Sequence, residues 1–212
     1  MSFAIAVIVL AIAAYLIGSL PSSVWVGRAF YGIDVRDHGS GNAGATNSFR
    51  VLGTELGIVV LFLDVVKGVT AGSLIHFVGG VVPGSEQFIN LQLMFGLLAV
   101  VGHIFPIYES FKGGKGIATL FGMLIAIHYV LALACLALFV VVLLATKYVS
   151  LSSILAAVSF PILSIFVFKR DEPLFIAFGI AAAILVVLTH QKNIVRLLNG
   201  EESKARLFKA KS

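Results

Sequence analysis

Long apolar stretches separated by short polar segments make up most of the chain. A helix that spans a membrane needs about 20 mostly apolar residues. Candidate spans lie at about residues 3–30, 54–80, 88–108, 115–128, 129–147, 151–168 and 173–190. The stretch from Ile117 to Ala145 is too long for one comfortable span at about 1.5 Å per residue. We divide it at its polar interruption, His128-Tyr129, which gives about seven spans.

The basic residues predict how these helices are oriented. If the N-terminus is outside, only Lys169 and Arg170 lie in outside loops. Twelve basic residues then lie inside: Arg28, Arg36, Arg50, Lys112, Lys115, Lys147, Lys192, Arg196, Lys204, Arg206, Lys209 and Lys211. Cytoplasmic loops carry an excess of Lys and Arg, and this split requires an odd number of spans. The sequence therefore predicts an all-α integral membrane protein with the N-terminus outside, the C-terminus cytoplasmic and one domain over residues 1–212.

Composition supports the same class. Hydrophobic residues make up 59% of the 212 residues and charged residues 12%, whereas a soluble domain is roughly 45–50% apolar and about 25% charged. A soluble domain of this length has too little interior for so many apolar side chains. This excludes an ordinary cytosolic enzyme, a disordered regulator and a nucleic-acid-binding protein. The single cysteine, Cys135, and the lack of a His pair at i,i+4 give no expectation of a metal or cofactor.

Two charged residues lie inside the second predicted span. A charge there costs roughly 2.5–3.5 kcal/mol on insertion scales. Asp64 and Lys67 are three residues apart, so they share a helix face and can pair. Two interpretations stay open: a structural ion pair, or a pair that orients groups of an active site.

The first of three polar segments on the predicted inside face covers residues 34–50. Gly39, Gly41 and Gly44 permit positive φ and close approach of the backbone to a ligand. Arg50 adds a guanidinium, and consecutive amides beside an arginine suit a phosphate. The uncharged hydrogen-bonding side chains of this segment are Ser40, Asn42, Thr46 and Asn47.

The second segment, residues 102–119, contains Lys112-Gly113-Gly114-Lys115-Gly116 just before an apolar helix. A glycine loop with lysines at a helix N-terminus favours an anion. The spacing differs from that of a Walker A motif, and no Ser or Thr follows Lys115, so ATP binding is not expected.

In the third segment, residues 190–202, His190, Asn193 and Arg196 are spaced by three residues and are predicted to line one helix face. Ser153 and its neighbours Ser150 and Ser152 fall on the same inside face. Two anion-binding loops at one aqueous boundary indicate two phosphate-bearing ligands, and the apolar body favours a lipid tail on at least one. A transporter or binding protein for an organic phosphate is the alternative, although no inverted repeat of the transporter kind is visible.

These motifs together resemble the bacterial acyl-phosphate:glycerol-3-phosphate acyltransferases. The resemblance rests on residues 39–47 with Arg50, on residues 111–116, and on His190 with Asn193 and Arg196, and it extends from Gly18 to Glu202. It departs at Ser23, where the family often has Gly. It implies a seven-helix enzyme of the bacterial cytoplasmic (inner) membrane with its site facing the cytoplasm. The implied reaction moves a fatty acyl group from acyl phosphate to the 1-hydroxyl of glycerol 3-phosphate, giving lysophosphatidate and phosphate.

The resemblance also implies roles for residues. Catalytic roles fall to Ser40, Arg50, Lys115 and His190. Substrate binding falls to Gly41, Asn42, Thr46, Lys112, Gly113, Gly114, Gly116, Ser153, Asn193 and Arg196, and a structural role to Glu202. We expect direct transfer by a monomer surrounded by membrane lipids. The hydroxyl proton goes either to an oxygen of the leaving phosphate, positioned by Ser40, or to His190 as general base.

Overall fold

The computed structural model describes residues 2–205, which form helices and no strands. The predicted all-α class is confirmed. Arg206, Lys209, Lys211 and Ser212 lie outside the described residues. The α-helices are α1 (Phe3–Gly18), α2 (Ser22–Tyr31), α3 (Ala45–Val51), α4 (Gly53–Ser73), α5 (Glu86–Ile104), α6 (Ile117–Thr146), α7 (Val149–Ile162), α8 (Pro173–Thr189) and α9 (Gln191–Leu198). Single turns of 3-10 helix lie at Val35–Asp37, Leu74–Phe77 and Ile107–Glu109, and a π-helical turn at Leu163–Val167.

Several of these helices are suited to a bilayer. Within the described part of the chain, four helices are long and apolar enough to cross it: Gly53–Phe77, Glu86–Glu109, Ile117–Thr146 and Val149–Val167. The number rises to six if α1 with α2, bent by 42°, and α8 with α9, bent by 62°, each form one span. The length and apolar composition of these helices confirm the predicted membrane character.

The predicted first span, residues 3–30, is two helices. The break falls at Ser19–Pro21, because Pro21 lacks a backbone N–H and disfavours helix at the residue before it. In α6 the backbone leaves the helical region at His128, with φ −153° and ψ 82°. This is the polar interruption at which the sequence predicts two short helices.

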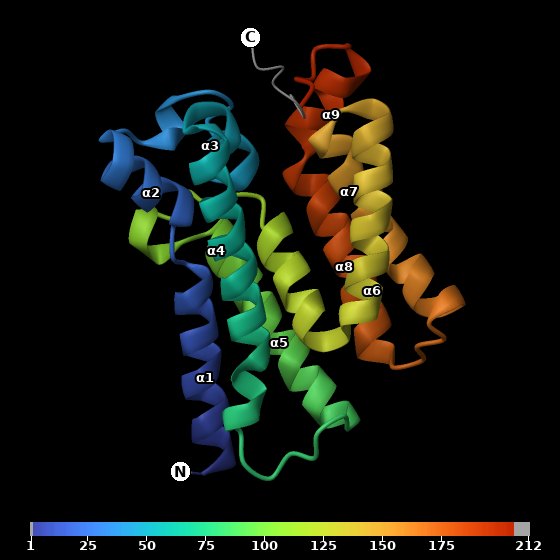
Figure 1. The fold of residues 1–212 in the computed structure, drawn as a ribbon. Coiled ribbons are helices and arrows are strands. Elements are labelled where there is room, and N and C mark those ends of the chain that lie inside the picture. Colours follow the sequence, from blue (N-terminus) through green and yellow to red (C-terminus); the bar gives the residue numbers. More distant parts are fainter. Residues whose placement is uncertain (1, 206–212) are drawn as a thin grey trace. The chain divides into compact units, whose positions relative to one another are not determined.

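The chain divides into two compact units, and the boundary in the sequence falls between Tyr129 and Val130. In the first unit α1, α4 and α5 lie side by side (Figure 1). Glycines permit this close packing, because a Cβ on Gly18 would overlap the backbone of Ala99 in α5. A Cβ on Gly68 of α4 would likewise overlap the backbone of Thr119. Small residues at helix crossings are typical of membrane proteins.

One end of this unit carries α2, α3 and the loop between them, as Figure 1 shows in blue and teal. A small core made by Val24, Val35, Leu52 and Val60 fastens them to the first turns of α4. The start of α1 lies at the opposite end. The polar segment over residues 34–50 is thus built on a packed base rather than on a free loop.

In the second unit α7 and α8 pack against each other. Phe160 of α7 lies edge-on to Phe175 and Phe178 of α8, with ring centroids 5.7 and 5.9 Å apart. After α9 the chain returns to the start of α7, where the amide of Ala205 donates to the carbonyl of Lys147 at 2.7 Å. This return holds the end of the third polar segment beside α7.

Candidate active site

The first polar segment is shaped by a buried asparagine. Asn47 accepts a hydrogen bond from the amide of Ser40 at 2.8 Å and donates to the carbonyls of Val35 and His38 at 2.7 and 3.1 Å. Gly39, with φ of 62°, has no room for a Cβ beside the Asn47 amide oxygen. The sequence placed Asn47 among the donors for a ligand, but its side chain is used to fix the loop.

Around this fixed asparagine the predicted contact residues remain accessible. Ser40, Gly41 and Thr46 are exposed, and Asn42 is half-buried. Arg50 is exposed on α3, and its side chain runs beside Gly39, since its Cδ lies 3.3 Å from where a Gly39 Cβ would be. The structure therefore brings the guanidinium-bearing helix and the Ser40 turn together.

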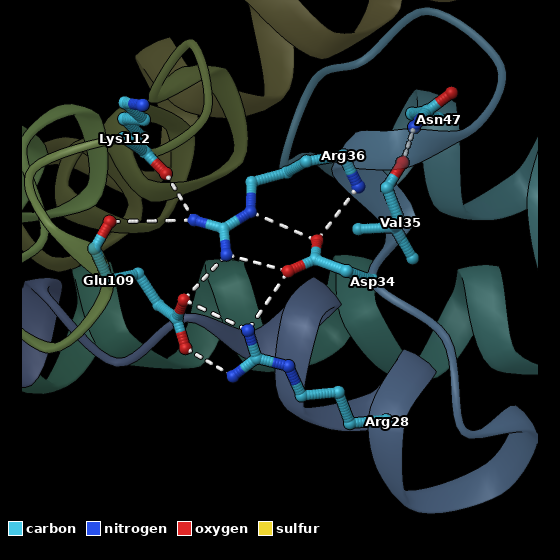
Figure 2. Close-up of polar contacts among 7 residues, drawn as sticks. All are labelled: Arg28, Asp34, Val35, Arg36, Asn47, Glu109 and Lys112. Carbon is cyan, nitrogen blue, oxygen red and sulfur yellow. Dashed lines mark hydrogen bonds and ion pairs between the residues drawn. The ribbon is translucent and has the colours of Figure 1, made fainter.

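Two arginines of this region are held by carboxylates. Arg36 donates to Asp34 at 2.6 and 2.9 Å and to Glu109 at 2.6 Å, and Arg28 donates to Asp34 at 2.9 Å and to Glu109 at 2.7 Å (Figure 2). The hydrogen bonds from Arg36 hold the pKa of Asp34 well below its usual range. We call these four residues the arginine–carboxylate cluster.

The arginine–carboxylate cluster links the first polar segment to the second. Arg36 also donates to the carbonyls of Glu109 and Lys112, at 3.4 and 3.3 Å (Figure 2). On sequence grounds, Arg28 and Arg36 served only as markers of orientation, and this contact was not predicted. The closeness of Asp34 and Arg36 in the sequence could have predicted their ion pair. Glu109 lies 73 residues from Arg36, so nothing in the sequence indicated that contact.

The second polar segment folds back on the end of α5. The amide of Gly113 donates to Ile104 and that of Gly114 to His103, each at 3.1 Å. A Cβ on either glycine would overlap His103, by its carbonyl or its ring. These two amides are thus engaged by the chain, and the glycines are needed for close packing. The first turn of α6, after Gly116 with φ of 76°, presents the amides that any helix N-terminus leaves without intrahelical partners.

The predicted pair of charges in α4 is present. Lys67 Nζ lies 2.9 Å from Asp64 Oδ1, and both side chains are buried. The i,i+3 spacing was sufficient to predict this pair. It was not sufficient to predict the neighbour from α5, His103, whose Nδ1 lies 3.6 Å from the same oxygen.

In the second unit, one carboxylate holds polar side chains of the third segment and of α7 together. Glu202 accepts hydrogen bonds from Ser150 at 2.8 Å, Asn193 at 2.6 Å and Arg196 at 2.8 Å. Burial opposes its charge, but the hydrogen bonds from Arg196, Asn193 and Ser150 prevail and lower the pKa of Glu202. Glu202 thereby pairs with the partly exposed Arg196 and orients Asn193.

His190 lies at the junction of α8 and α9 rather than on the face of α9 that carries Asn193 and Arg196. It is buried, with Nδ1 2.8 Å from the carbonyl of Val186. Because a carbonyl only accepts, this contact places the proton on Nδ1 and the lone pair of the neutral ring on Nε2.

Ser153 is buried in the first turns of α7, and its neighbour Ser152 donates to the carbonyl of Tyr148 at 2.8 Å.

Over residues 2–205, no three His, Cys, Asp or Glu side chains are grouped so that they could hold a metal ion. Of the five arginines in this range, four pair with carboxylates, namely Arg28, Arg36, Arg170 and Arg196. Arg50 is the fifth, and its guanidinium has no carboxylate partner among the described residues.

Comparisons with known proteins agree with one another. Residues 8–200 match the family described as glycerol-3-phosphate acyltransferase. A glycerol-3-phosphate acyltransferase of Fusobacterium nucleatum is 46% identical over 191 residues, covering 90% of this chain and 93% of that protein. The crystal structure of PlsY (YgiH), an integral membrane glycerol 3-phosphate acyltransferase, in its glycerol 3-phosphate form has a TM-score of 0.81 at 34% identity and covers 94% of this chain and 95% of that one. The lysophosphatidic acid form of that enzyme has a TM-score of 0.80 at 34% identity, covering 93% and 94%.

Proposed function

Because the chain belongs to the PlsY-type family of glycerol-3-phosphate acyltransferases, we propose that it transfers a fatty acyl group from acyl phosphate to the 1-hydroxyl of glycerol 3-phosphate. Family membership makes it a membrane acyltransferase of phospholipid synthesis, and it disfavours the alternative of a transporter. The products are lysophosphatidate and phosphate. The glycerol 3-phosphate and lysophosphatidic acid forms of the related enzyme support the acceptor and the product.

The position of Arg50 supports this proposal most directly. Arg50 is the arginine of the described residues that no carboxylate neutralises, and it lies beside the turn that carries Ser40. An exposed guanidinium next to hydroxyl and amide donors suits a phosphate group. The lysines of the second segment, Lys112 and Lys115, add positive charge at the N-terminus of α6, where the helix dipole also favours an anion.

The reaction needs little chemical activation. An acyl phosphate already has a good leaving group, so neither ATP nor an acyl-enzyme is required. The enzyme must hold two anions that repel each other, and Arg50, Lys112 and Lys115 reduce that repulsion. It must also place the hydroxyl about 3–3.5 Å from the acyl carbon.

We assign the remaining roles as the resemblance implies them. Ser40 positions the acyl phosphate, with Gly41, Asn42 and Thr46 as further contacts in the first segment. Gly113, Gly114 and Gly116 shape the second loop around Lys115. In the second unit, His190, Asn193, Arg196 and Ser153 serve the glycerol phosphate. The proton passes to an oxygen of the leaving phosphate, with His190 as the competing base.

The same proposal includes the arrangement in the membrane. We propose a single, monomeric enzyme domain in the bacterial inner membrane with its site facing the cytoplasm and its N-terminus outside. Dividing α6 at His128 raises the count of six spans to seven, which the distribution of basic residues requires.

The test uses purified protein with acyl phosphate and labelled glycerol 3-phosphate, without ATP or added metal. Lysophosphatidate and one equivalent of phosphate should form. Turnover with an acyl thioester but not with acyl phosphate would refute the proposed donor. Uptake of glycerol 3-phosphate into sealed vesicles without product formation would favour a transporter instead.

A further inference from the structure

A cluster of three ionisable side chains lies buried beneath the second polar segment, and the reaction as described does not use it. Asp64 and Lys67 come from α4 and His103 from the last turn of α5; their side chains are 2%, 5% and 6% exposed. Lys67 Nζ lies 2.9 Å from Asp64 Oδ1, and His103 Nδ1 lies 3.6 Å from the same atom. We call these residues the buried triad.

The buried triad is joined directly to the loop that carries Lys115. The carbonyl of His103 accepts the amide of Gly114, and the next carbonyl, that of Ile104, accepts the amide of Gly113. The Nε2 of the His103 ring lies where a Cβ on Gly114 would be. Lys115 is the next residue, so a tilt of the His103 ring would move the backbone that carries this lysine.

The buried triad also reaches the other side of the loop. Lys67 donates to the carbonyl of Leu20 at 3.0 Å, at the break between α1 and α2. A small pocket is lined by Lys67, His103, Gly113 and Gly114, and by Ala43 of the first segment. The triad therefore has the glycine loop on one side and the first polar segment beside it.

Stability alone does not account for such a cluster. Charges within a membrane span are costly, and well-packed apolar residues often replace a buried ion pair without loss of stability. Their direct contact with the loop at Gly113 and Gly114 indicates that these charged residues also act on the conformation of that loop. We propose that Asp64, Lys67 and His103 are positioning residues, which fix the Gly113–Gly114 backbone so that Lys115 meets the substrate phosphate. This inference rests on the proposed function only in assigning Lys115 to a phosphate.

The test is a double-mutant cycle of His103→Ala and Lys115→Ala. A misplacement of about 1 Å can cost about 100-fold in rate, so His103→Ala should lower kcat/KM by about that factor. If His103 acts through Lys115, the same substitution in the Lys115→Ala background should change kcat/KM by less than about 3-fold, because coupled residues are not additive. Independent, multiplicative losses would overturn the proposal.

The control is Gln92→Ala on the same helix. Gln92 is also a buried polar residue of α5, but its side chain donates to the carbonyl of Ala126 in α6, at 2.9 Å. The two single variants should lower the melting temperature in detergent to a similar extent, but only His103→Ala should impair kcat/KM. Equal kinetic losses in both would show that His103 is only structural.

A rescue variant keeps the test decisive if His103→Ala does not fold. His103→Asn retains a donor near the place of Nδ1, facing Asp64, and should recover most of the activity. If His103→Asn has a normal melting temperature but no more activity than unfolded protein, positioning through Asp64 is refuted. The assay uses whichever acyl donor supports turnover by the unmodified enzyme, so a wrong donor refutes the proposed function and leaves this test intact.

Discussion

Glu109→Gln tests the arginine–carboxylate cluster that joins the first two polar segments. The substitution keeps the shape of the side chain but removes its charge and turns one acceptor oxygen into a donor. Glu109 accepts from Arg36 at 2.6 Å and from Arg28 at 2.7 Å. A hydrogen bond to a charged group contributes about 1.5–3 kcal/mol. The Arg28 pair adds less, because its side chain is 50% exposed and exposed ion pairs contribute about 0–1 kcal/mol.

Because Asp34 still binds both arginines, we expect a net loss of about 1–2 kcal/mol in the free energy of unfolding. For a chain of this size, that loss lowers the melting temperature by about 2–8 °C. The loop that precedes Lys112 would also be held less firmly against the first segment. We therefore expect kcat/KM to fall by about 10-fold, which corresponds to about 1.4 kcal/mol. Thermal unfolding in detergent and initial-rate kinetics measure the two effects separately.

Glu172→Gln is the matched control. Glu172 pairs with Arg170 at 2.8 Å with comparable partial burial, outside the three polar segments. It should lower the melting temperature and leave kcat/KM unchanged. If Glu109→Gln behaved in the same way, the cluster would be a stabilising contact without a role in positioning the loops. If Glu109→Gln left both quantities unchanged, the ion pairs in Figure 2 would not govern this region at all.

Four further outcomes are expected. Lys115→Ala should fold and lose about 10- to 150-fold in kcat/KM, the equivalent of one charge-assisted phosphate contact of about 1.5–3 kcal/mol; near-normal kinetics would remove Lys115 from the site. His190→Asn should raise KM for glycerol 3-phosphate while retaining measurable kcat, whereas a fall in kcat of about 10²–10⁴-fold would make His190 the base. Because the pKa of Glu202 is lowered in the folded state, its ionised carboxylate stabilises the fold at pH values above the ordinary pKa of Glu, about 4.3. The melting temperature should therefore exceed that of Glu202→Gln by the full amount at neutral pH, and the difference should shrink as the pH falls through the lowered pKa. A difference that does not change with pH would contradict this. Cysteines introduced at Ser85 and Ser212 should label from opposite sides of intact cells, and labelling from one side would refute seven spans.

Features that depend on neighbours in sequence could be predicted. The long apolar runs predicted the helices, because a bilayer requires internally bonded backbone. The i,i+3 spacing predicted the pair of Asp64 and Lys67. The polar interruption at His128 coincides with the residue where α6 leaves helical geometry. In each case the deciding interaction is local or depends only on the period of the helix.

Features that depend on distant partners could not be predicted. The amides of Gly113 and Gly114 suited a phosphate on sequence grounds, but the fold returns the loop to α5 and engages both with carbonyls. Asn47 is likewise taken up by the carbonyls of Val35 and His38. A sequence shows which groups can bind an anion, and only the fold shows which of them the chain has already bound.

The distinction changes how the site is understood. The sequence offered many cations and donors on one face, and the structure separates them by what they already contact. Arg28, Arg36 and Arg196 each pair with an acid of the chain. Among the residues that the structure describes, Arg50 has no carboxylate partner, and it lies beside an exposed serine turn. The proposed transfer of an already activated acyl group requires such an unneutralised cation more than a strong nucleophile, because two phosphates must be held together against their repulsion.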